Sequence, residues 1–156
     1  MPAPSDPSTP GLATPDEAER AFYAAFAAAD IEAMSAVWLE DDTSVCIHPM
    51  RPRLLGWAAI RQSWQAIFTA GEPMRFSLTT VRRQRSESMA VHSLYEDIRF
   101  GPGFAGRSLI LATNVYLRTP EGWRIQIHHG SPIAAPPPGA ETEGGRAGPG
   151  PARTVH

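Results

Sequence analysis

The sequence predicts an α+β fold, a cone-shaped domain in which three N-terminal helices pack on a strongly curved antiparallel sheet. Apolar residues recur at helical spacing between residues 14 and 70, and from Met74 onward they alternate with polar residues as in strands. A third observation is the hairpin pattern of residues 107–132, in which two alternating runs flank a turn. Because the helices precede the strands along the chain, we expect them to gather on one face of the sheet.

Local start signals predict each helix. Residues 14–17, Thr-Pro-Asp-Glu, supply an N-cap residue, a proline at the first helical position and a glutamate at N3. Asp30 is a second N-cap candidate, and Gly56 precedes a third helix. The third helix carries five apolar residues on one face, which makes it a major core element: Trp57, Ile60, Trp64, Ile67 and Phe68.

Strand signals begin with a short β-branched run at residues 43–48, which Pro49 stops. The turn at residues 119–122, Thr-Pro-Glu-Gly, fits a type I connection, so the runs on either side of it should pair as antiparallel neighbours. The longer strands are expected at residues 74–80, 89–100, 107–118 and 123–129.

Composition predicts a single domain. Residues 1–13 are a proline-rich leader and residues 134–156 a Gly/Pro-rich tail, and both are expected to be disordered, which leaves residues 14–133 as the folded part. With 14 Lys and Arg against 16 Asp and Glu, the formal net charge of −2 argues against nucleic acid or an anionic membrane as a partner. The lone Cys46, the absence of a signal-peptide pattern and the absence of a long apolar run predict a cytoplasmic protein.

Two consecutive histidines end the last predicted strand. Side chains of His128 and His129 must point to opposite faces, so the pair does not form a metal site, and we predict none. His129 continues the apolar face of Trp123, Ile125 and Ile127 and is therefore expected to reach a pocket, whereas His128 is expected outside. A hydrogen-bonded core residue is the alternative role for His129.

Two further residues are candidate acid/base groups. His48 ends the short strand before the proline-rich loop, where it is either an acid/base group or a residue of the pocket rim. Asp97 continues the face of Ser93 and Tyr95, and in an apolar cavity its carboxyl would have the raised pKa that suits a general base. The alternative for Asp97 is a surface ion pair with Arg99 or another arginine.

Aromatic side chains supply a surface for a hydrophobic or aromatic ligand, although the same spacing is typical of plain core. Asn114 lies on the Tyr116 side of its strand, where it is placed to donate to a ligand or to a second copy. The candidate ligand-binding residues are Trp38, Trp64, Tyr95, Asn114 and Tyr116.

Residues 14–133 resemble the SnoaL-like and DUF4440-like bacterial branches of the nuclear transport factor 2-like superfamily. The resemblance rests on Gly-Trp-Ala-Ala-Ile-Arg at 56–61, Glu-Gly-Trp-Arg-Ile at 121–125 and His-His-Gly-Ser-Pro at 128–132. Thr-Asn-Val-Tyr-Leu-Arg at 113–118 is also similar to the association domain of calmodulin-dependent kinase II. The resemblance implies a pocket between sheet and helices, and a dimer that packs through the sheet.

The strand at residues 107–118 carries apolar residues on both faces, which independently predicts a homodimer through the sheet. We expect a domain that binds a small hydrophobic or aromatic molecule and needs no cofactor. Isomerase, cyclase or dehydratase chemistry by Asp97, His129 and His48 would extend that function. The chain has no residue-by-residue match to the acid/base positions of the superfamily's enzymes, so a non-catalytic ligand-binding or association module is the alternative.

Overall fold

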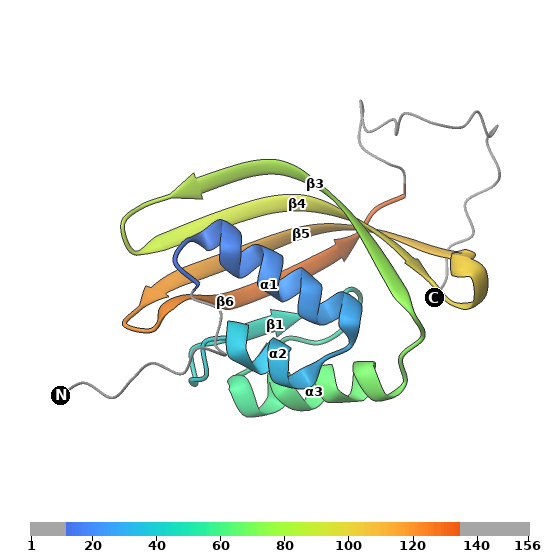
Figure 1. The fold of residues 1–156 in the computed structure, drawn as a ribbon, viewed down its shortest axis with the longest axis horizontal. Coiled ribbons are helices and arrows are strands. Elements are labelled where there is room, and N and C mark those ends of the chain that lie inside the picture. Colours follow the sequence, from blue (N-terminus) through green and yellow to red (C-terminus); the bar gives the residue numbers. More distant parts are fainter. Residues whose placement is uncertain (1–11, 135–156) are drawn as a thin grey trace.

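Three helices cover one face of a curved sheet in the computed structural model, which describes residues 12–134 (Figure 1). This arrangement confirms the predicted α+β fold. Residues 1–11 and 135–156, on which most of the expected leader and tail fall, lie outside the described residues. The elements are α1 (Pro15–Ala28), α2 (Ile31–Val37), β1 (Val45–Ile47), β2 (Leu54–Leu55), α3 (Trp57–Thr69), β3 (Met74–Arg85), β4 (Met89–Phe100), the 3-10 helix η1 (Pro102–Phe104), β5 (Gly106–Thr119) and β6 (Gly122–Pro132).

The sheet has six strands in the order β2-β1-β6-β5-β4-β3. The four long strands are antiparallel neighbours, as predicted, and β5 and β6 form the expected hairpin. The short strand β1 runs parallel to β6 and places Cys46 opposite His128, so the sheet is mixed. Two parallel strands need a crossover connection rather than a hairpin, and here the crossover consists of all the elements between β1 and β6 in the chain.

The predicted helix caps are present. The Thr14 hydroxyl accepts from the Glu17 amide at 3.1 Å, and the Asp30 carboxylate accepts from the amides of Glu32 and Ala33, each at 3.1 Å. Each cap satisfies amides that have no partner within the helix. None of the helices within residues 12–134 has the length and apolar character that a bilayer crossing needs.

The core lies between the helices and the concave face of the sheet. Trp64 of α3 and Phe22 of α1 are completely buried and pack edge to face, with ring centroids 5.7 Å apart. Leu12, the residue before the last of the expected leader, is only 5% exposed, and its carbonyl accepts from the Trp123 amide at 2.8 Å. The folded part therefore includes Leu12.

A β-bulge in β6 decides which histidine faces the core. Val115 pairs with Ile127, whereas the next residue of β5, Tyr116, pairs with Ile125, so Gln126 is an extra residue on β6. The extra residue shifts the alternation by one position. His128 consequently faces inward and is 2% exposed, whereas His129 faces outward and is exposed. The predicted assignment, with His129 on the pocket face and His128 outside, is wrong for this reason.

Candidate functional site

Four buried polar side chains form a hydrogen-bonded chain inside the cone. The Tyr23 hydroxyl donates to Glu96 Oε2 at 2.5 Å and accepts from Asn114 Nδ2 at 3.0 Å. Asn114 Oδ1 lies 2.6 Å from His128 Nδ1, and since an amide oxygen only accepts, that imidazole nitrogen carries the proton. We call Tyr23, Glu96, Asn114 and His128 the interior polar chain. It ties α1 to β4, β5 and β6.

Burial controls the protonation of the interior polar chain. It raises the pKa of the Glu96 carboxyl to about 7, against an opposing effect of the hydrogen bond from Tyr23. Burial also raises the pKa of the Tyr23 hydroxyl far above its usual range, and the neighbouring Glu96 charge adds to this rise. The pKa of His128 falls to about 3, chiefly through burial and then through the charges of His48 and His129. Near neutral pH only Glu96 is therefore ready to exchange a proton.

A second polar cluster lies further along the same inner face of β4. His92 Nδ1 is 3.0 Å from Glu19 Oε1, and Arg83 donates to Glu19 Oε2 at 2.8 Å. Arg83 also forms an ion pair with Asp16 at 3.3 Å. Burial alone would raise the pKa of the Glu19 carboxyl, but the hydrogen bonds from His92 and Arg83 outweigh it and the net pKa is lowered. This cluster holds the start of α1 against β3 and β4.

A cavity of about 470 Å³ opens beside α3, and we call it the α3 pocket. His48 Nε2 lies 2.9 Å from Ser63 Oγ, and that hydroxyl donates to the Ile60 carbonyl at 2.8 Å. The Ser63 hydroxyl has one hydrogen, so Nε2 of His48 is the donor and Nδ1 is left as an acceptor. Burial, and then the charge of Arg51, lowers the pKa of His48 to about 4, so the ring is neutral at neutral pH. The lining residues are His48, Arg51, Pro52, Leu54, Ser63, Ala66, Ile67 and Ala70.

Trp64 contacts both the wall of the α3 pocket and the interior polar chain. Its ring lies edge-on to His48 at 4.8 Å between centroids, and 6.0 Å from the ring of His128. The Trp64 indole N–H is buried and has no hydrogen-bond partner within residues 12–134. A packed aromatic side chain therefore connects the pocket wall with the interior polar chain.

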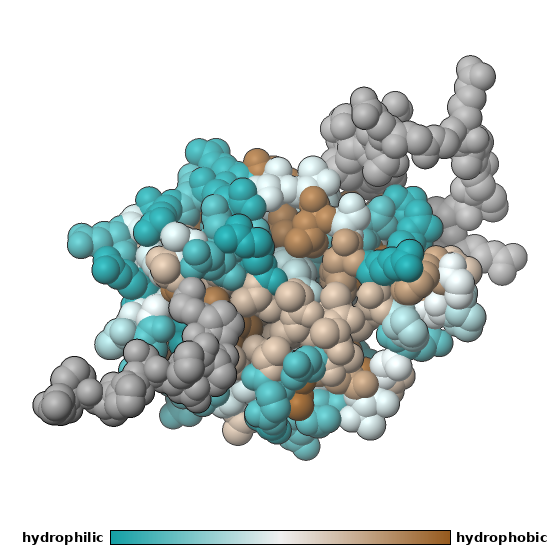
Figure 2. Space-filling model, in the orientation of Figure 1, coloured by the Kyte–Doolittle hydropathy of each residue, from teal (hydrophilic) through white to brown (hydrophobic). Residues whose placement is uncertain are grey.

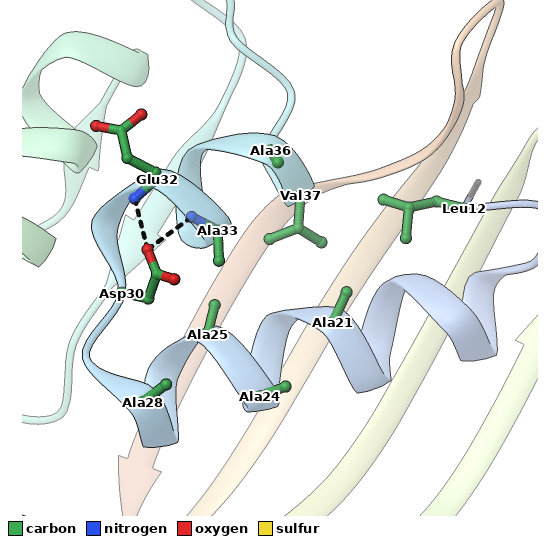
Figure 3. A pocket seen from close by; sticks show the side chains of 10 residues that line it. All are labelled: Leu12, Ala21, Ala24, Ala25, Ala28, Asp30, Glu32, Ala33, Ala36 and Val37. Carbon is green, nitrogen blue, oxygen red and sulfur yellow. Dashed lines mark hydrogen bonds between the residues drawn. The ribbon is translucent and has the colours of Figure 1, made fainter. Parts of the chain in front are cut away.

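A larger groove of about 540 Å³ runs between α1 and α2, and the close-up view shows its alanine side chains facing one another (Figure 3). The surface over these helices is correspondingly apolar (Figure 2). Asp30 and Glu32 are its acidic residues, and one oxygen of Asp30 is committed to the cap of α2. The groove has little acid/base chemistry to offer, so the α3 pocket is the better candidate site.

The three predicted catalytic residues do not converge. Asp97 lies on the outer face of the sheet, where Arg107 holds both of its oxygens at 3.0 and 2.7 Å, rather than in an apolar cavity. This is the ion pair that the sequence offered as the alternative, with Arg107 as the main partner. His129 is exposed on the same outer face, and only His48 lines a pocket.

The predicted ligand-binding residues divide between the two faces. Trp38, Trp64, Asn114 and Tyr116 all face the interior and are at most 1% exposed. Tyr95 lies on the outer face, because it occupies the position between the inward-facing Leu94 and Glu96 of β4. None of these five lines the α3 pocket, and Asn114 alone belongs to the interior polar chain.

Sequence reasoning missed the acidic and histidine members of the interior. Glu19 and Tyr23 are four residues apart, the spacing that places them on one face of α1. On β4, His92 and Glu96 share the alternate face with Ala90. These polar residues share a helix or strand face with apolar residues that must be buried, and that shared face was the available signal.

Three helices on one side of a curved, mixed six-stranded sheet define a nuclear transport factor 2-like α+β domain. Residues 16–136 match the model of the SnoaL-like domain family, and the chain belongs to that family. Among solved structures, a protein of Thiobacillus denitrificans described as a calcium/calmodulin-dependent protein kinase type II association domain is 41% identical, with a TM-score of 0.74, over 80% of this chain and 98% of its own. A protein of Streptomyces avermitilis described as a dehydratase of the nuclear transport factor 2-like family is 32% identical, with a TM-score of 0.69, over 76% of this chain and 93% of its own.

A plant protein is also similar. The F-box protein SKIP8 of Arabidopsis thaliana is 30% identical over 103 residues, which are 65% of this chain. The match spans only 42% of the plant protein's length. The similarity therefore concerns the shared domain rather than the whole of that protein.

Proposed function

We propose that this chain is a small-molecule-binding domain whose ligand occupies the α3 pocket. One observation carries the proposal: a hydrogen-bonded His48–Ser63 pair stands in the wall of an otherwise largely apolar cavity. Such a cavity suits a mostly apolar ligand that is oriented by a few polar groups. The Nδ1 acceptor of His48, which lies 4.0 Å from the Cys46 sulfur, and the guanidinium of Arg51 favour a ligand that carries a hydroxyl and a negatively charged group.

Binding is better supported than catalysis. The pKa of His48, lowered to about 4, makes its ring a weak base, and Glu96, whose pKa is about 7, is only 2% exposed. Isomerase or dehydratase chemistry would require a ligand to displace Trp64 and reach the interior polar chain. The relative described as a dehydratase supports that extension by similarity, while the burial of Glu96 argues against it.

Filling the α3 pocket is expected to weaken ligand binding. Ala66 is exposed on α3 and lines the pocket, so Ala66→Trp places an indole in the cavity. We expect the affinity for the aromatic anion 1-anilinonaphthalene-8-sulfonate, measured by fluorescence titration, to fall about tenfold or more. Native mass spectrometry of the purified protein would test the same variant for a co-purifying ligand.

Ala58→Trp is the matched control, because Ala58 is an exposed alanine of the same helix that does not line the pocket. Its affinity should stay within about twofold of the parent value. Equal binding by both variants would overturn the assignment of the ligand to the α3 pocket.

A second candidate function is association through the outer face of the sheet. Large apolar side chains gather on this face, where a partner would cover them: Met89, which is 42% exposed at the start of β4, and the half-buried Leu109, Leu111 and Val115 of β5. The 41% identical relative described as an association domain supports this reading. We therefore propose a homodimer, in a reducing cytoplasmic location that suits the buried thiol of Cys46.

A charge in the middle of this face is expected to separate the copies. Leu111 is half-buried on the outer face of β5, between Tyr95 and Ser131 on the neighbouring strands. We expect light scattering after size exclusion to give a dimer for the parent at micromolar concentration and a monomer for Leu111→Glu. Leu55→Glu, at an exposed leucine of β2, should remain dimeric. A monomeric parent would contradict the association role.

A further inference from the structure

Three arginines lie side by side across the outer face of the sheet. The strand register pairs Arg75 of β3 with Arg99 of β4, and Arg99 with Arg107 of β5. All three are exposed, and neighbouring strands are only about 4.8 Å apart. Like charges directly opposite one another destabilise a sheet, so an anion bound to a continuous row of three arginines would relieve their repulsion. We call these residues the arginine row.

Among the residues that the structure describes, one carboxylate contacts the arginine row. Asp97 binds Arg107 through both oxygens, at 3.0 and 2.7 Å, and its distance to Arg99 Nε is 3.8 Å, which is too long for a hydrogen bond. Within residues 12–134, neither Arg75 nor Arg99 has any other ion pair. Three positive charges less one negative charge leave a local charge of +2.

The end of the row is held in place by an aromatic ring. The guanidinium of Arg75 lies 3.9 Å from the centre of the Phe104 ring. Phe104 follows the turn at Gly103 with a φ of +53°, a left-handed conformation that a phenylalanine rarely adopts. The loop accepts an unfavourable backbone conformation at the residue that orders Arg75, a feature often found at binding sites.

We propose that the arginine row is a binding site for the phosphate group of a small phosphate monoester. A monoester carries a charge close to −2 at neutral pH, which matches the charge that Asp97 leaves uncompensated. Guanidinium groups bind phosphate oxygens through paired hydrogen bonds, and Arg75 and Arg99 lie opposite one another on neighbouring strands, where both can donate to one phosphate. The site lies on the opposite face of the sheet from the α3 pocket and is independent of the ligand proposed there.

Calorimetric titration of the full chain with phenyl phosphate and with inorganic phosphate tests this site. Arg99→Gln and Arg75→Gln are each expected to weaken binding about tenfold or more, since each removes a charge-assisted contact. Arg82→Gln removes the same charge from an exposed position nearer the other end of β3 and should change the affinity by less than about twofold. Tighter binding of phenyl phosphate than of inorganic phosphate would indicate that the organic part also contributes.

Three results would overturn the proposal. An equal loss of affinity in Arg82→Gln would mean that only net charge attracts the anion, and equally tight binding of succinate would mean that the site does not select phosphate. Absence of phosphate binding, together with a change of oligomeric state in Arg99→Gln, would assign the arginine row to a contact with carboxylates of a second copy.

Discussion

His128→Ala is expected to lower the free energy of unfolding by about 3 kcal/mol or more, and His129→Ala to change it by less than about 0.5 kcal/mol. The first substitution leaves Asn114 Oδ1 buried without its donor and opens a cavity beside Phe22, whose ring centre is 4.9 Å from that of His128. The second removes an exposed side chain from the outer face. Urea denaturation of both variants at pH 7 measures the difference.

His128→Phe separates the two contributions. It keeps an aromatic ring against Phe22 and Trp64 but offers no donor to Asn114, so about 1 to 2 kcal/mol should be lost through the unsatisfied amide oxygen alone. Equal destabilisation by His128→Ala and His129→Ala would contradict the inward orientation of His128 that the bulge at Gln126 produces.

The fold could be predicted because its determinants are local. The Thr14 and Asp30 caps, the helical stripe of α3 and the turn at residues 119–122 each fix one element through contacts within a few residues. The bulge at Gln126 is not of this kind. The alternation of Trp123 and Ile125 is intact before it, and an extra residue is recognisable only from the pairing with β5.

The candidate site was harder to predict from the sequence, because its polar residues acquire their roles from partners that are distant along the chain. Tyr23 and Glu96 are 73 positions apart, and the sequence around neither residue indicates that the Tyr23 hydroxyl donates to the Glu96 carboxyl group. Asp97 was attractive because it continues the face of Ser93 and Tyr95, but Arg107 on the neighbouring strand neutralises it on the outer face. His48 was the exception, because a loop that follows a short strand is a common place for a pocket wall.

Glu96→Gln is expected to make the stability of the protein less dependent on pH between about 4.5 and 7. Burial raises the pKa of Glu96 from 4.5 to about 7, so the folded protein keeps this proton over a range in which the unfolded chain has lost it. The contribution of Glu96 to stability therefore falls as the pH rises from 4.5 towards 7 and is fully lost above 7. Integrated over that range, the loss is about 3 kcal/mol, which a neutral glutamine does not suffer.

The measurement is the difference in unfolding free energy between Glu96→Gln and the parent, from urea titrations at pH 5 and pH 8. The lowered pKa values of His48 and His128 destabilise the folded state as the pH falls below 6.5, but both proteins carry these residues, so their effect cancels in the difference. Glu87→Gln, at an exposed carboxylate, should give a flat difference. If the difference for Glu96→Gln is equally flat, the Glu96 carboxyl is ionised in the folded protein at both pH values. The interior polar chain must then hold a buried negative charge, with the Tyr23 hydroxyl as its hydrogen-bond donor.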